Sequence, residues 1–259
     1  DGYQLVESPH LGMEHQSAIA YGNGFANGYR GRDLSGTGWG KDWDYIIVHE
    51  SGHEWFANNI TTNDIADMWV HEGFTMYSEV LFINYHYGRE GADAYCRGVR
   101  NRIRNDRPII GHYGVNEEGS GDMYNKGAGL LHHVRETINN DSLFRDILIG
   151  LNQEFRHQTV DSKQVETYII KRAGIDFQPL FDQYLRTNKV PVLEYNQSGP
   201  TLKLRLSNCN ESLKLPIRVD GKKSMEILLT TQWQEFKVEE NVSIKSISDN
   251  YYFNRKEVY

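Results

Sequence analysis

Apolar side chains recur every three to four residues through most of the first two thirds of the chain, the spacing of one helix face. In residues 65–87 this spacing continues without a proline, which predicts a long, buried helix. The apolar runs 45–48 and 55–57 predict a second buried helix around a short polar stretch. The same periodicity returns in four later segments: 130–138, 142–156, 162–173 and 176–187.

The pattern changes after residue 195. Residues 202–206 read Leu-Lys-Leu-Arg-Leu, and such alternation predicts a strand with one buried face. Similar alternation occurs in three further segments: 215–219, 225–229 and 233–238. We therefore expect an α+β fold with a mainly helical domain over residues 1–195 and a small β-sandwich over residues 196–259.

Composition and charge narrow the possible partners. The chain of 259 residues has a net charge of −7 and no basic cluster, which argues against a nucleic-acid partner. No apolar run approaches the ~18 residues that a membrane span requires. The chain shows no targeting segment, so its location stays open between cytoplasmic and exported. Residues 1–90 carry a net charge of −9 and residues 91–259 a net charge of +2.

Residues 49–53 contain the strongest chemical signal, because they read His-Glu-Ser-Gly-His. Histidines four residues apart lie one above the other on a helix, so His49 and His53 can reach one metal ion. Glu50, directly after the first histidine, is placed to act as a general base on a water molecule at that metal. A buried helix with hydrogen-bonded histidines is the alternative.

Glu72 follows His53 by nineteen residues and lies in the predicted long helix. Two histidines and a glutamate make a zinc site with an open fourth position, which is typical of catalytic zinc. We expect one Zn²⁺ per chain at His49, His53 and Glu72, and hydrolysis of an amide bond. Glu79, two turns beyond Glu72, is predicted to orient a ligand, with a surface carboxylate as the alternative.

Taken together, the motifs resemble those of the gluzincin aminopeptidases, the zinc metallopeptidases of peptidase family M1 that include aminopeptidase N and leukotriene hydrolase. The resemblance rests on H-E-x-x-H followed after eighteen residues by Glu, with Trp-Phe directly behind the helix motif. Residues 12–15 resemble the family's G-x-M-E-N segment, and residues 124–127 resemble its Y-x-K-G motif. The resemblance covers residues 5–190.

This resemblance implies a thermolysin-like catalytic domain that acts on peptides with a free N-terminus. Glu14 would bind the α-amino group of the substrate, with Gly12 and Met13 beside it in the substrate-binding segment. Tyr124 would donate its hydroxyl to the developing oxyanion. The chain departs from the family at His15, where asparagine is usual, and this affects the expected detail of amine recognition.

Three segments are expected to shape the cleft. Residues 11–21 are predicted to form an extended edge segment that can pair with a peptide backbone. The glycine-rich residues 31–40 are expected to form a loop that approaches the cleft, and residues 108–124 a polar loop that wraps around it. The acidic first part of the chain would attract a cationic amino terminus.

Two other functions remain open from the sequence. A thermolysin-type zinc endopeptidase shares the metal chemistry, and an inactive peptide-binding fragment shares the fold. The family places a large β-rich domain ahead of the matched region, where it contributes to the substrate pocket. An N-terminal β domain of the same protein is therefore an expected partner.

Overall fold

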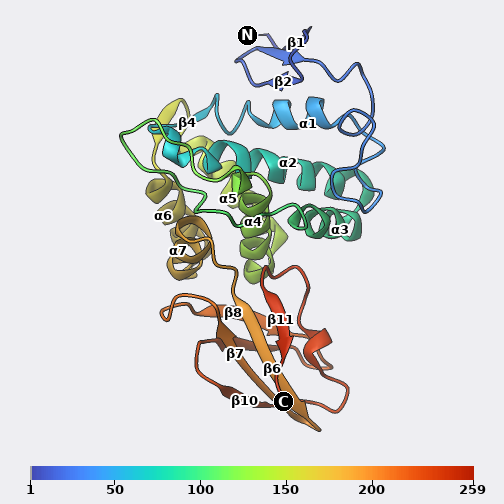
Figure 1. The fold of residues 1–259 in the computed structure, drawn as a ribbon, viewed down its shortest axis with the longest axis vertical. Coiled ribbons are helices and arrows are strands. Elements are labelled where there is room, and N and C mark those ends of the chain that lie inside the picture. The colour runs from blue at the N-terminus through green and yellow to red at the C-terminus, as the bar shows by residue number, and fades with distance from the viewer. Residues whose placement is uncertain (1) are drawn as a thin grey trace.

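The computed structural model describes residues 2–259 (Figure 1). Its α-helices are α1 (Tyr45–Gly52), α2 (Trp69–Tyr87), α3 (Arg89–Arg100), α4 (Asn125–Ile138), α5 (Asp141–Glu154), α6 (Ser162–Ala173) and α7 (Gln178–Arg186). Short 3₁₀ turns are η1 (Ile65–Asp67), η2 (Gly121–Met123) and η3 (Ile244–Ser246). The strands are β1 (Gln4–Glu7), β2 (Gly12–Met13), β3 (Ala18–Tyr21), β4 (Ile60–Thr62), β5 (Gln158–Val160), β6 (Val192–Ser198), β7 (Thr201–Ser207), β8 (Leu215–Val219), β9 (Met225–Leu229), β10 (Gln234–Lys237) and β11 (Asn254–Glu257).

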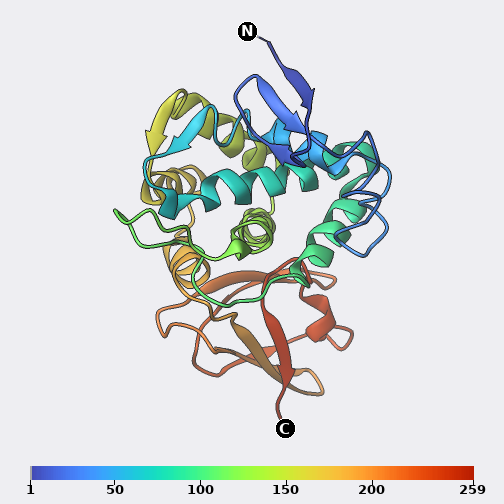
Figure 2. The ribbon, with the colours of Figure 1, turned by 45° about the horizontal axis from the view of Figure 1, so that its top comes forward.

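A three-stranded sheet at the N-terminal end lies over α1 (Figure 2). Its order is β1-β3-β2, with β1 parallel and β2 antiparallel to β3. The prediction of one extended segment over residues 11–21 is therefore wrong in part. The chain turns between β2 and β3, where Ser17 has a φ of +63°, and β3 is the central strand, so within residues 11–21 only β2 lies at an edge of the sheet.

Helix α2 lies at the centre of the helical layer and contacts α1, α3 and α4. Helices α2 and α4 meet at Gly73 and Gly127, where a Cβ on Gly127 would lie 2.8 Å from the Cα of Gly73. Glycine is required here because the two backbones touch. Within residues 2–259 no helix combines the length and the apolar character that membrane crossing demands.

The glycine-rich loop over residues 31–40 packs on α3, and its approach to the cleft stays a prediction. It covers α3, because a Cβ on Gly98 would meet Ser35 and a Cβ on Gly91 would meet the ring of Trp39. The loop closes the helical core on the side of α3.

The C-terminal strands form a four-stranded sheet of order β10-β7-β6-β11 and a two-stranded sheet of β8 and β9. The alternating sequence correctly predicts which side chains of β7 point into the core. Leu202, Leu204 and Leu206 are buried, and Lys203 is exposed. Strand β6 begins at Val192, and the division into domains at residue 195 stays a prediction.

Candidate metal centre

Helix α1 brings His49, Glu50 and His53 to one buried position. The helix begins at Asp44, whose side chain accepts hydrogen bonds from the backbone N–H groups of the first turn, a favourable cap. The imidazole rings of His49 and His53 lie one turn apart with their centroids 5.0 Å apart. Their exposed fractions are 5% and 1%.

Glu72, on α2, faces both histidines. Its Oε2 lies 3.4 Å from the Nε2 atoms of His49 and of His53. Two ligand atoms at about 2.0–2.1 Å from a tetrahedral zinc ion are themselves roughly 3.3–3.4 Å apart. The three ligand atoms also form a group within 4.8 Å of one another, so they fit one zinc ion.

The polar atoms of this group support the same interpretation. Oε2 of Glu72 is buried and has no hydrogen-bond partner among residues 2–259, which is costly unless something else binds it. Burial would raise the pKa of Glu72, but the two imidazoles hold it well below its usual range. The carboxylate is therefore ionised and available to a cation.

Both imidazoles are oriented through their other nitrogen. Nδ1 of His49 lies 2.7 Å from Oε1 of Glu79, which is completely buried. Nδ1 of His53 lies 3.0 Å from the backbone oxygen of Phe56. These contacts fix Nε2 of each ring as the atom that faces Glu72. The predicted contact of Glu79 with a candidate ligand is present.

Glu50, on α1, points its side chain at strand β2. Its exposed fraction is 6%, and its Oε2 has no hydrogen-bond partner in the described part of the chain. Gly12 on β2 passes so close that a Cβ there would collide with Oε1 of Glu50. Burial raises the pKa of Glu50 to about 7, although His49 and His53 act in the opposite direction. A carboxylate with this pKa can both take and return a proton at neutral pH.

Glu14 follows strand β2 and lies beside Glu50 and His53, with ligand atoms within 4.8 Å of one another. The side-chain amide of Asn58 donates to the backbone oxygen of Glu14 at 3.2 Å. This bond ties the end of β2 to the segment that follows α1. Met13, the preceding residue, is exposed.

Tyr124 reaches the centre from the junction of η2 and α4. Its ring stacks on His49 with centroids 5.9 Å apart and an interplanar angle of 24°. Burial and the negative charge of Glu72 raise its pKa well above its usual range, so its hydroxyl stays protonated. Lys126, which belongs to the same motif, points away from the metal centre. Its Nζ donates to the backbone oxygen of Thr187.

The structure thus brings six of the predicted site residues close together: Glu14, His49, Glu50, His53, Glu72 and Tyr124. Gly12 lies against Glu50, whereas the side chain of Met13 is exposed, and the roles of these residues stay predictions. Two contributors have no counterpart in the sequence motifs. Thr75, whose Oγ1 lies 3.1 Å from Nδ1 of His53, follows Glu72 by three residues, and helical spacing could have identified it. Tyr95 on α3, whose hydroxyl donates to Oε2 of Glu79 at 2.5 Å, carries no such signal.

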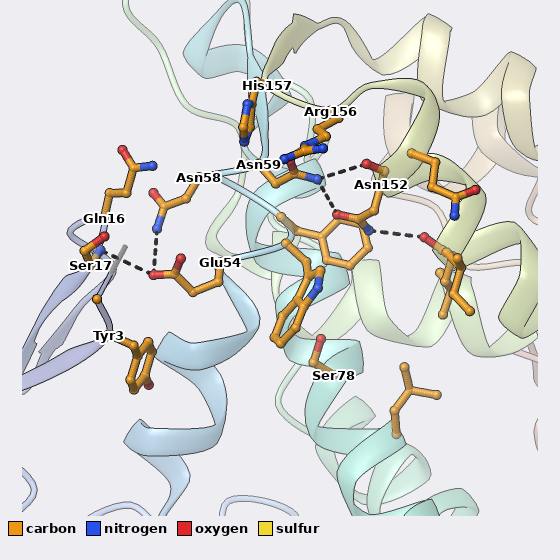
Figure 3. Close-up of a pocket in the computed structure, with 17 residues that line it drawn as sticks. Tyr3, Gln16, Ser17, Glu54, Asn58, Asn59, Ser78, Asn152, Arg156 and His157 are labelled. Atoms are coloured by element: carbon orange, nitrogen blue, oxygen red, sulfur yellow. Dashed lines mark hydrogen bonds between the residues drawn. The ribbon is translucent and has the colours of Figure 1, made fainter.

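A cavity of about 830 Å³ adjoins the centre but does not contain it. The cavity is lined by the segment that follows His53, by residues next to the N-terminal strands and by α5 (Figure 3). Figure 3 shows Glu54 accepting from the backbone N–H of Ser17 and from Asn58, and Asn59 donating to Asn152. These bonds hold the segment that follows α1.

Comparison with known proteins gives one family match. Residues 34–184 match the "Peptidase family M1 domain". "Probable aminopeptidase 1" of Saccharolobus solfataricus is 23% identical over 224 residues, covering 79% of this chain and 28% of the relative. "Aminopeptidase B" of Mus musculus is 27% identical over 164 residues, covering 55% of this chain and 25% of the relative. The chain thus spans about a quarter of the length of these relatives.

Solved structures show the same fold. An aminopeptidase A of Legionella pneumophila, solved in complex with aspartic acid, has a TM-score of 0.70 and 15% identity, covering 98% of this chain and 32% of that one. An M1 zinc metallopeptidase of Deinococcus radiodurans, bound to a Tyr-Ser-Ala substrate, has a TM-score of 0.58 and 21% identity, covering 73% of this chain and 40% of that one.

Proposed function

The chain belongs to peptidase family M1, and on this premise we propose that it carries the catalytic centre of a zinc aminopeptidase, in a thermolysin-like domain followed by a β-sandwich. The convergence of His49, His53 and Glu72, with Glu50 and Glu14 beside them, is the observation that carries the proposal.

His49, His53 and Glu72 would hold one zinc ion per chain. When bound, zinc supplies Lewis-acid activation of water and of the scissile carbonyl. The protein would contribute an orienting contact on each imidazole and a buried, ionised carboxylate. These contacts keep the three donor atoms together before the ion arrives.

Glu50 would transfer a proton from the attacking water to the leaving group. Its carboxylate would accept a proton from the attacking water and pass it to the departing amine, as general acid–base catalysis requires. The Tyr124 hydroxyl would donate a hydrogen bond to the oxyanion that forms at the carbonyl. A positioned donor of this kind typically contributes about 100- to 1000-fold in rate.

Glu14 would select substrates with a free amino group. The free edge of β2 can pair with an extended peptide, and the carboxylate of Glu14 lies just after that edge. A peptide paired there would place its ammonium group against Glu14 and its first peptide bond over Glu50. Peptides with a free N-terminus are therefore the proposed substrates.

The curated relatives extend well beyond the matched region. We propose that a β-rich domain, N-terminal to this region in the same protein, completes the pocket around Glu14. The exposed side chain of Met13 is available for such a contact.

Glu50→Gln tests the assigned base. The variant should bind one zinc ion as the wild type does, because Glu50 is not among the three proposed ligands. Its hydrolysis of aminoacyl fluorogenic substrates should fall by about 100- to 10,000-fold. Zinc content is measured by atomic absorption and turnover by fluorescence.

Glu54→Gln is the matched control. Glu54 accepts hydrogen bonds from Ser17 and Asn58, and the side-chain oxygen of glutamine can accept the same bonds, so this variant should keep its turnover. Full activity in Glu50→Gln would refute the role of Glu50. Cleavage of N-acetylated peptides at internal bonds would instead indicate an endopeptidase. Zinc binding without any turnover in the wild type would indicate a peptide-binding module.

A further inference from the structure

We propose that Tyr95 is a positioning residue for the metal centre, acting on His49 through the carboxylate of Glu79. This role rests on the proposed zinc site. The chain of contacts runs from α3 to α2 to α1: the Tyr95 hydroxyl donates to Oε2 of Glu79 at 2.5 Å, and Oε1 of Glu79 lies 2.7 Å from Nδ1 of His49.

Glu79 depends on both contacts. The carboxylate is completely buried, and a buried carboxylate is unfavourable unless its oxygens are hydrogen-bonded. Within residues 2–259 it forms no ion pair with a lysine or arginine, and its charged-group contact is with His49. Tyr95 satisfies the oxygen that His49 does not, and the two donors together fix the rotation of the carboxylate.

The ring of Tyr95 cannot turn away to another partner. Its exposed fraction is 1%, and it packs against Trp43 with centroids 5.8 Å apart. Trp43 is itself fixed, because its indole N–H donates to the backbone oxygen of Trp39 at 2.8 Å. Tyr45, which also packs against Trp43, stacks on His49 at 5.4 Å with an interplanar angle of 12°.

The two histidines have different partners at Nδ1. His53 is oriented by neutral groups, the backbone oxygen of Phe56 and the hydroxyl of Thr75. His49 is oriented by a carboxylate, which increases the basicity of an imidazole ligand. Tyr95 therefore acts on His49, the histidine with the charged partner. Loss of the Tyr95 hydroxyl should weaken the binding of zinc by the site to which His49 contributes.

The test compares Tyr95→Phe with Tyr77→Phe. Tyr77 is a matched control, because it is equally buried and its hydroxyl contacts His132, away from the metal centre. Each variant loses one buried hydroxyl. The zinc dissociation constant is measured by competition with a chromogenic chelator, and the visible spectrum of the Co²⁺-substituted protein reports ligand geometry.

Tyr95→Phe should weaken zinc binding about 3- to 10-fold and alter the Co²⁺ spectrum, less than the 10- to 100-fold typical of a residue that touches a ligand directly. Tyr77→Phe should leave both unchanged. In a Glu79→Gln background, Tyr95→Phe should have no further effect on zinc affinity, because the two residues act in series.

The outcomes separate the two levels of the proposal. A wild type that binds one zinc ion, together with equal affinities for Tyr95→Phe and Tyr77→Phe, overturns the role of Tyr95 and leaves the metal centre intact. An additive loss in the Glu79→Gln background likewise overturns it. A wild type that binds no zinc overturns the metal centre and this role with it.

Discussion

Glu14 differs from the other charged residues of the site in coming from a strand edge, whereas Glu50 and Glu72 come from helices. Because it lies beside Glu50 and His53, a cation bound by it would lie next to the proposed general base. Under the proposed function, its position would determine which end of a peptide can enter.

Glu14→Ala should lower kcat/KM for aminoacyl substrates by about 10- to 100-fold, the effect of losing a hydrogen bond to a charged group. Cleavage of N-acetylated analogues should change little, because they carry no ammonium group. Both rates are measured by fluorescence. Glu7→Ala, an exposed glutamate on β1, is the control. Equal losses on both substrate classes would refute amine recognition by Glu14.

The periodicity of the α-helix explains why individual residues of the candidate site could be predicted from the sequence. A spacing of four converts sequence position into a common direction, so His49 and His53 were identifiable. Tyr95 was not, because its contact with Glu79 depends on how α3 packs on α2. Motif resemblance supplied Glu14 and Tyr124, which spacing alone does not identify.

The segment that joins α1 to β4 contains a strained residue. Ala57 has a φ of +151°, in the region that glycine favours, and its exposed fraction is 7%. The preceding residue, Phe56, supplies the backbone oxygen that orients His53. The strain is therefore located next to the contact that positions a candidate ligand.

Ala57→Gly should raise the free energy of unfolding by about 1 kcal/mol, because relief of backbone strain of about 1–3 kcal/mol exceeds the entropic cost of glycine. Urea denaturation measures the change. Ala66→Gly is the control, since Ala66 is completely buried and has no positive φ, and it should destabilise. If Ala57→Gly destabilises as much as this control, Ala57 is unstrained.

Elements with long periodic patterns were predicted closely, as α5, α6 and α7 show. The short strands β4 and β5 were not predicted. They pair in parallel from distant parts of the chain, with Thr61 opposite Thr159, and three residues carry too little alternation to identify a strand. Tertiary contact rather than local pattern specifies such strands.

At the scale of the whole molecule, the helical layer and the C-terminal strands share a buried polar boundary. The backbone N–H of Tyr252 donates to Nδ1 of His133 on α4 at 3.2 Å. Arg100 on α3 donates to the backbone oxygens of Asp249, Asn250 and Tyr251. His132 and His133, neighbours on α4, are both completely buried.

Acid should therefore weaken the folded protein. Burial, with the nearby charge of Arg100, lowers the pKa of His133 to about 3, whereas an unfolded histidine titrates near pH ~6.5. Between these values the unfolded chain binds a proton that the folded chain does not. Stability is retained above pH ~6.5 and falls by about 1.4 kcal/mol per pH unit below it for each such histidine.

Urea denaturation at a series of pH values between 7 and 5 measures this slope. His133→Asn should show a shallower slope than the wild type, whatever its stability at pH 7. His112→Asn, which changes an exposed histidine, should keep the wild-type slope. An unchanged slope in His133→Asn would show that His133 is not the source.

The contact between Gly73 and Gly127 sets the separation of the two helix backbones that carry Glu72 and lead from Tyr124. Glu72 precedes the first glycine by one residue, and Tyr124 precedes the second by three. Rotamer exchange in the surrounding side chains cannot alter a spacing set in this way. Engineers who reshape the proposed substrate pocket should therefore leave both glycines unchanged, because any larger residue would push α2 and α4 apart and with them the backbones that carry the carboxylate and the phenol.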